Sequence, residues 1–181
     1  MNMLVRFFIM ISLLKQQQKQ HHEQQLNGQM SLEFVTAPTL RHYRILPHDM
    51  GFRTHLPNYR YLSFIELNIT HWLLACCHQA NRKSLRWIIA MQEMIYLKEV
   101  KFLDKMSVSS QVVGWDNKYV YFTHRFFVKN QLMAVGMTKV LLINKQGACP
   151  PSIFNMVGEQ LTDVITTWNT HQTAVKSTPS S

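Results

Sequence analysis

Residues 49–78, DMGFRTHLPNYRYLSFIELNITHWLLACCH, decide the fold, because a proline-flanked loop is followed here by a long apolar helix. The apolar residues after Pro57 recur every three or four positions, which places them on one face of a helix. They are Leu62, Ile65, Ile69, Trp72, Leu73 and Cys76. Asn58 is expected to cap this helix with its side-chain oxygen, and Pro57 disfavours an earlier start. We therefore predict one helix over residues 58–78, covered on most sides.

The residues on either side of this helix predict strands. After the helix, β-branched and aromatic residues fill four segments, which are residues 85–102, 106–115, 118–128 and 132–143. The connections at residues 114–117 and 129–131 are short enough to force antiparallel neighbours. Before the helix, residues 34–46 are expected to form a first strand, interrupted by Pro38. A closing helix is predicted over residues 154–168.

Residues 118–128 carry bulky side chains on both faces of their predicted strand. One face holds Val120, Phe122, His124 and Phe126. The other face holds Tyr119, Tyr121, Thr123, Arg125 and Phe127. This pattern is expected of a strand that packs on the helix with one face and is partly covered on the other, as by a partner subunit.

The length and composition indicate one globular domain. A chain of 181 residues leaves little room for a second core, and 46% hydrophobic residues with 11% aromatics exclude a disordered protein. The folded domain is predicted over residues 33–170, followed by a polar tail over residues 171–181. Residues 1–32 are expected to combine an apolar segment with a linker, because residues 15–29 are rich in Gln and His and nearly lack apolar side chains.

Residues 1–14, MNMLVRFFIMISLL, are apolar apart from a single arginine. The segment is shorter than the roughly 18 to 20 residues that a spanning helix needs. No small-residue cleavage site follows it. Two interpretations stay open, namely a segment that makes peripheral contact with a membrane, or an upstream extension that contributes nothing to the folded domain.

The charge and cysteine content limit the classes of partner. The 19 Lys and Arg residues exceed the 10 acidic residues, which suits an anionic partner, but they are scattered rather than gathered into runs. A solvated basic surface is therefore expected rather than a nucleic-acid groove, and a phosphorylated small ligand would suffice as the anionic partner. Three cysteines, of which Cys76 and Cys77 are adjacent, make neither a disulfide framework nor a zinc-ligand spacing. We expect a cytoplasmic protein without a metal site, with membrane association left open.

The order of a strand, a loop, a long helix and four antiparallel strands resembles the hotdog fold. Residues 49–62, DMGFRTHLPNYRYL, are similar to the signature of the 4-hydroxybenzoyl-CoA thioesterase-like acyl-CoA thioesterases, an Asp followed by His-x-Asn-Asn-x-x-Tyr at the start of the central helix. Asp49, His55, Asn58 and Tyr61 match the signature, whereas Pro57 replaces its first Asn. The apolar N-terminus is similar to that of a membrane-associated branch of the superfamily.

The resemblance covers about residues 40–144 and implies an α+β hotdog domain. Its long central helix would be wrapped by an antiparallel sheet of five or six strands. Members of the family usually form homodimers, so a homodimer or a higher homo-oligomer is also implied.

The same resemblance implies a site at the start of the helix. Asp49 would act as the nucleophile or as the general base for water. Unpaired backbone amides around Tyr59 and Arg60 would polarise the thioester carbonyl, because a helix N-terminus offers free donors and a positive dipole end. His55 would position the loop, and Tyr61 would line the pocket or simply pack.

Glu66 is a second catalytic candidate, because it lies beside the apolar stripe, where an unpaired carboxylate is costly. An ion pair with an Arg or a Lys at a strand or dimer boundary is the alternative for this residue. The favoured function is hydrolysis of an acyl-CoA to a free acid and CoA, with coenzyme A entering only as part of the substrate. The alternative, which Pro57 favours, is a non-catalytic module that binds an acyl chain or lipid at a membrane surface. Motifs of serine hydrolases and nucleotide-hydrolysing enzymes are absent.

Overall fold

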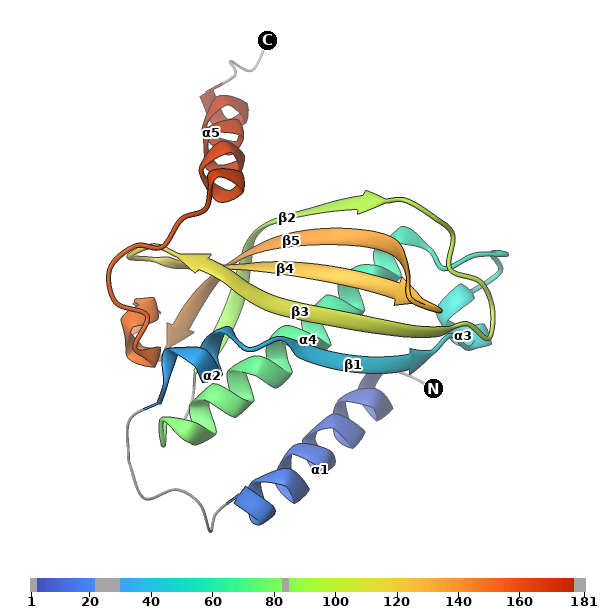
Figure 1. The fold of residues 1–181 in the computed structure, drawn as a ribbon, viewed down its shortest axis with the longest axis horizontal. Coiled ribbons are helices and arrows are strands. Elements are labelled where there is room, and N and C mark those ends of the chain that lie inside the picture. Colours follow the sequence, from blue (N-terminus) through green and yellow to red (C-terminus); the bar gives the residue numbers. More distant parts are fainter. Residues whose placement is uncertain (1–2, 22–29, 83–84, 178–181) are drawn as a thin grey trace.

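The structure is a computed structural model that describes residues 3–21, 30–82 and 85–177 of the chain. A curled antiparallel sheet wraps one long helix, α4 (Asn58–Gln79), as Figure 1 shows. The strand order is β1-β3-β4-β5-β2, with β6 paired to β5. The strands are β1 (Thr39–Arg44), β2 (Arg86–Tyr96), β3 (Lys105–Trp115), β4 (Tyr119–Val128), β5 (Gln131–Asn144) and β6 (Gly147–Cys149). The expected α+β class, with a six-stranded sheet around a central helix, is therefore confirmed.

Helix α4 occupies nearly the predicted range, but its first turn differs from the expectation. Pro57 is the N-cap residue, in an extended conformation with φ −65° and ψ 147°, and Asn58 is already helical. The expected cap by the Asn58 side chain is therefore wrong. The carbonyl of Pro57 instead accepts the Arg60 amide at 2.9 Å. The proline ring fixes the backbone angle that a cap position requires, so the helix begins directly after it.

The segments at the two ends of the domain differ more from the predictions. Residues 34–46 are not one strand, because a short helix, α2 (Leu32–Thr36), precedes β1. Ser31 caps α2 by accepting the Phe34 amide at 3.2 Å, a local bond that competes with strand formation.

The closing helix lies further along the chain than the predicted 154–168. A short 3-10 helix, η1 (Pro151–Phe154), ends at Asn155, whose left-handed φ of 60° stops it. Helix α5 (Asp163–Ser177) follows and extends into the expected polar tail.

The inner face of β4 is buried and its outer face is partly covered, as its sequence pattern predicts. On the inner face, Trp72 of α4 meets Phe122 edge to face, with ring centroids 5.0 Å apart. On the outer face, Tyr121 packs against Ile165 and Trp168 of α5. The outer face of β4 is thus covered at one end by a helix of the same chain.

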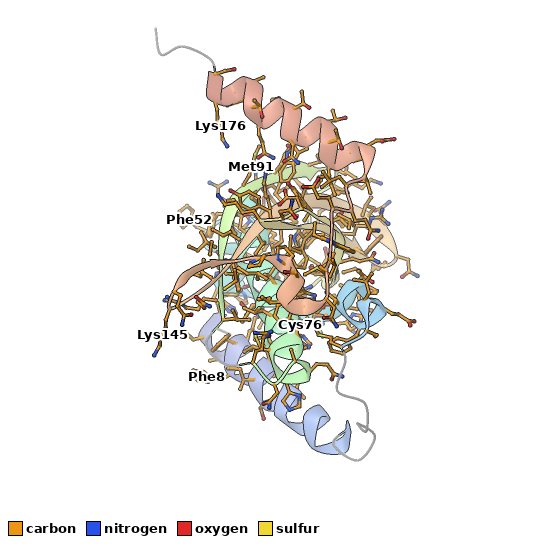
Figure 2. All side chains as sticks on the ribbon, turned by 90° about the vertical axis from the view of Figure 1, so that its left-hand side faces the viewer. Phe8, Phe52, Cys76, Met91, Lys145 and Lys176 are labelled. Atoms are coloured by element: carbon orange, nitrogen blue, oxygen red, sulfur yellow. The ribbon has the colours of Figure 1, made fainter. Side chains whose placement is uncertain are left out.

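Helix α1 (Met3–His21) lies along α4, so that α4 is enclosed between the sheet and α1 (Figure 1). Helices α1 and α5 lie at opposite ends of the molecule, marked by Phe8 and Lys176 in Figure 2. The helical range of α1 extends into the stretch interpreted from its composition as a linker, and the rest of that stretch, residues 22–29, lies outside the described residues. Within the described part of the chain, no helix is long and apolar enough to cross a bilayer.

Candidate active site

Asp49 lies on α3 (Pro47–Met50), a single helical turn between β1 and α4. Proline at the first position starts the turn with a preset φ, and Asp49 follows at its third position. Its Oδ2 accepts the backbone amide of Leu46 at 3.0 Å, which fixes the carboxylate against the turn. The Asp49 side chain is fully buried.

Two arginines from different helices surround this carboxylate. Arg6 of α1 donates from Nη2 to Asp49 Oδ2 at 2.7 Å and to the carbonyl of Arg44 at 3.1 Å. Arg60 of α4 places its Nε 3.5 Å from Asp49 Oδ1. Arg60 is held across α3 by a bond from its Nη2 to the carbonyl of His48 at 2.7 Å. A buried carboxylate requires such compensation, because an unpaired charge away from water is strongly destabilising.

The two oxygens of Asp49 have different surroundings. Oδ2 accepts hydrogen bonds from Arg6 and from the Leu46 amide. Oδ1 lies 3.3 Å from His48 Nε2, yet it is buried and accepts no hydrogen bond from any described residue. Buried polar atoms without a hydrogen-bond partner are rare in native proteins, and a catalytic role is one explanation for such an atom. Oδ1 is therefore held only by longer contacts, with His48 Nε2 and with Arg60 Nε at 3.5 Å.

Three of the predicted site residues lie together at a different place, around the start of α4. His55, Asn58 and Tyr61 line a cavity of about 220 Å³ with Tyr96 and Lys98. Asp49 is not among the residues that line it. Burial raises the pKa of Tyr61 to about 12, so its hydroxyl stays protonated at neutral pH.

Further contacts hold this cavity together. The Tyr96 hydroxyl donates to the Asn58 carbonyl at 3.3 Å. His55 Nδ1 lies 3.8 Å from Glu99 Oε1, which ties the loop before α4 to the segment after β2.

The amides at the start of α4 are fewer than expected. The Arg60 amide already donates to Pro57, so its expected role as a free donor is wrong. The amides of Asn58 and Tyr59 open the helix and have no carbonyl four residues earlier within it. The Tyr59 side chain is exposed and reaches solvent instead of the cavity. Arg60 contributes to the site through its guanidinium rather than through its backbone.

Glu66 lies apart from both groups. The expectation that it sits beside the apolar stripe as a costly carboxylate is wrong, because the residue is exposed. It lines a cavity of about 280 Å³ between α1 and α4, together with Met3, Phe7 and Ser63. No ion pair or hydrogen bond joins it to Asp49 among the described residues. The preceding residue, Ile65, is fully buried. A step of one residue around the helix therefore separates a buried position from an exposed one.

Sequence reasoning missed Arg6 and His48 as neighbours of Asp49. Arg6 gives a signal that is visible in hindsight, since it is the one charged residue among residues 1–14. A lone cation on an apolar helix that packs on the domain requires a buried partner. His48 gives no such signal. No cluster of His, Cys, Asp or Glu suited to a metal occurs among the described residues.

The fold of this chain is shared with solved structures of other proteins. A similar fold occurs in a probable thioesterase from Bartonella henselae. That structure has a TM-score of 0.55 and 13% identity, covering 63% of this chain and 98% of the other. A hypothetical protein from Staphylococcus aureus solved in complex with CoA matches at a TM-score of 0.58 and 12% identity, covering 81% and 89%. A gentisyl-coenzyme A thioesterase matches with a TM-score of 0.56 and 18% identity, over 63% of this chain and 97% of the other.

Residues 45–161 match the family described as the thioesterase-like superfamily, and the chain belongs to it. The resemblance to hotdog-fold thioesterases predicted from the sequence is therefore confirmed. A probable thioesterase of Saccharomyces cerevisiae, YBR096W, is 34% identical over 103 residues. This match covers 53% of the chain and 44% of the yeast protein, so the chain spans less than half the length of that curated relative.

Proposed function

We propose that this protein hydrolyses the thioester bond of an acyl-CoA to a free acid and CoA. Membership of the thioesterase-like superfamily supports the reaction class. The observation that carries the assignment to a residue is Asp49 Oδ1, a buried carboxylate oxygen that accepts no hydrogen bond from the described residues. It lies on α3, the helical turn that precedes α4 in the chain, and the first amides of α4 have no carbonyl partner within that helix.

Two routes are open to this oxygen. As a general base, Asp49 accepts a proton from water while the water oxygen bonds to the thioester carbon. As a nucleophile, Oδ1 itself bonds to that carbon, and water later hydrolyses the resulting anhydride. In both routes the C–S bond breaks, CoA leaves as a thiolate that takes up a proton, and the acid is released. The amides of Asn58 and Tyr59 would hold the negative charge that develops on the carbonyl oxygen.

The cavity at the start of α4 is proposed to receive the part of the substrate next to the thioester. His55, Asn58 and Tyr61 present polar groups on one side of it, while Tyr96 provides an aromatic wall. Lys98 is exposed at its edge and suits a CoA phosphate by charge. The neighbouring structure solved with CoA shows that the fold can accommodate this ligand in another protein.

The proposed assembly is a homodimer. Strand β2 is an edge of the sheet and pairs on one side only, with β5. Its 11 residues include the exposed Ile88 and Ile95. A long apolar edge strand tends to pair with another chain.

The alternative function, a non-catalytic acyl-binding or lipid-binding module at a membrane surface, is favoured by α1. Its outward face is apolar and exposed at Leu4, Val5, Phe8, Ile9 and Leu13. Peripheral contact between this face and lipid is a proposal that fits either function, because the described side chains of residues 3–13 include no exposed charge.

The first experiment compares thiol release from a panel of acyl-CoA esters by the wild-type chain and by Asp49→Asn. We expect a loss of about 100-fold or more in the variant, the usual scale for a proton-transfer group. Asp163→Asn, which neutralises an exposed carboxylate at the start of α5, is the matched control and should leave release unchanged. Circular dichroism and thermal melting show whether Asp49→Asn still folds.

The other outcomes separate the alternatives. An Asp49→Asn variant that folds and keeps its activity would remove Asp49 from the mechanism. If neither the wild type nor any variant releases thiol at any chain length, while the wild type retains acyl ligands in equilibrium dialysis, the binding module replaces the enzyme.

A further inference from the structure

Helix α1 lies outside the residues that match the superfamily, yet it contacts the candidate active site. Its Arg6 is 4% exposed and lies against Asp49, which is fully buried. The Arg6 guanidinium also lies over two aromatic rings, 5.6 Å from the centroid of Tyr43 and 5.1 Å from that of Phe64. A residue from an added helix thus occupies one side of the proposed catalytic carboxylate.

We propose that α1 is a displaceable cap that holds the active site closed in this arrangement, with Arg6 as its latch on Asp49. The inference rests on the proposed function, because it assigns a state to the same carboxylate. Thioester hydrolysis would require that Arg6 leave Asp49 and that α1 move away from the start of α4.

The contacts of Asp49 argue for a closed state. Its side chain has no solvent exposure, so neither water nor a thioester carbon reaches Oδ1 as the chain stands. Arg6 donates to Oδ2, and a cation held at 2.7 Å stabilises the negative charge that a base or a nucleophile must share with the reacting atom. A carboxylate held in this way is well paired but poorly reactive.

The packing of α1 argues that the cap can leave. Its inner side rests on α4 mainly through apolar residues, among which Met10 is fully buried and Met3 and Phe7 are partly buried. Its outer side is also apolar, with Phe8 64% exposed and Leu4 61% exposed. A helix with apolar residues on both sides buries only one of the two sides in this arrangement. Any surface that covers the outer side would compete with α4 for the helix.

The test uses the full chain and removes the latch alone. Arg6→Met keeps the length and the apolar stem of the side chain but removes the cation, and Arg6→Lys keeps the charge. We expect thiol release by Arg6→Met to rise by about fivefold or more, the lower range of typical coupling between linked sites, and Arg6→Lys to fall between it and the wild type. Phe8→Ala, on the same helix but facing outward, is the control and should behave as the wild type. Unchanged or reduced release by a folded Arg6→Met would overturn the proposal.

A second readout does not depend on activity. A water-soluble carbodiimide with an amine nucleophile converts exposed carboxylates to amides, and mass spectrometry locates the label. Asp49 should label slowly in the wild type and several times faster in Arg6→Met. Cys76, which is fully buried, reports on general unfolding through its reaction with a thiol reagent and should stay protected in both proteins.

The two readouts separate the two hypotheses. If neither the wild type nor any variant releases thiol, but Asp49 labels faster in Arg6→Met while Cys76 stays protected, the cap stands and the hydrolase function fails. If the wild type is an active hydrolase whose release depends on Asp49, while neither its rate nor the labelling responds to Arg6→Met, the hydrolase stands and the cap is wrong.

Discussion

His124 on β4 is the most deeply buried titratable base in the described part of the chain, and its proton can be placed from its partners. Asn68 Nδ2 donates to Ser110 Oγ at 2.9 Å, so the Ser110 hydroxyl is free to donate to His124 Nδ1 at 2.7 Å. His124 Nε2 then carries the proton and donates to Thr138 Oγ1 at 3.1 Å. The hydrogen-bond network assigns this tautomer, with a neutral imidazole. Burial lowers the pKa of His124 to about 3.

The lowered pKa of His124 predicts that the protein loses stability in mild acid. The unfolded chain binds a proton at the ordinary histidine pKa of about 6.5, whereas folded His124 does so only at about 3. Between these values the unfolded state binds more protons, so the free energy of unfolding falls as the pH falls. His71, whose pKa is lowered to about 4 by burial and by the Arg41 guanidinium, adds to the same effect. Each histidine contributes at most about 1.4 kcal/mol per pH unit.

Urea unfolding between pH 7 and pH 4.5 measures this dependence. His124→Asn should lower the stability at pH 7. It should also flatten the dependence of stability on pH, because the variant lacks one histidine whose pKa differs between the folded and unfolded states. His171→Gln, at an exposed position on α5, should leave the slope unchanged. A slope that is the same in His124→Asn and the wild type would show that other groups carry the acid sensitivity.

Among the elements, the contact of β3 with the segment before α5 leaves almost no space. The backbones of Trp115 and Gln160 exchange two hydrogen bonds of 2.9 Å each. A Cβ on the neighbouring Gly114 would lie 2.3 Å from the Gln160 carbonyl oxygen and 2.6 Å from Ile165 Cδ1. The glycine allows two backbones to approach, and this contact sets where α5 can begin to pack on the sheet.

Gly114→Ala should therefore destabilise the domain by about 1–3 kcal/mol, the usual cost of overpacking, because the backbone at Gln160 has to move. Thermal melting and urea unfolding measure the change. Gln111→Ala, at an exposed position on the same strand, should change the stability much less. A Gly114→Ala protein as stable as the wild type would mean that the segment at Gln160 shifts without cost.

The elements also show which predictions local patterns can support. Helix α4 and strands β2 to β5 were predicted near their observed positions, because apolar periodicity and short turns are properties of neighbouring residues. The predictions for α2 and α5 were wrong in type or position. The Ser31 cap and the left-handed Asn155 each depend on one residue, and such signals are easily outweighed by the strand or helix propensity around them.

At the scale of the whole molecule, the proposed homodimer can form along either edge strand of the sheet, β2 or β1. If two copies pair along β2, Ile95→Lys places a charge at the interface and should shift the protein toward monomer in analytical ultracentrifugation. Leu40→Lys is the matched control, since Leu40 is equally exposed on β1, at the opposite edge of the sheet. A dimer that is lost in Leu40→Lys but kept in Ile95→Lys would place the interface on β1. A wild-type protein that stays monomeric at high concentration would contradict the proposed homodimer.

The candidate site shows the limit of reasoning from sequence. The spacing of Asp49, His55, Asn58 and Tyr61 is visible in the chain, and three of these residues do line one cavity. Asp49 lies elsewhere, in a buried cluster with arginines from two helices. The motif places residues near the start of α4, but rotation around the helix and the packing of α3 decide which side each occupies.

The sequence by itself determined that this protein is an α+β domain with one enclosed helix and an antiparallel sheet. Those features follow from side-chain periodicity over 10 to 20 neighbouring residues, a range of about one element. Only the tertiary structure decided that Arg6 meets Asp49 across 43 positions of the chain and that Glu66 faces solvent. The physical reason is that a buried ion pair depends on how α1 packs against α4, and no local pattern along the chain specifies that packing.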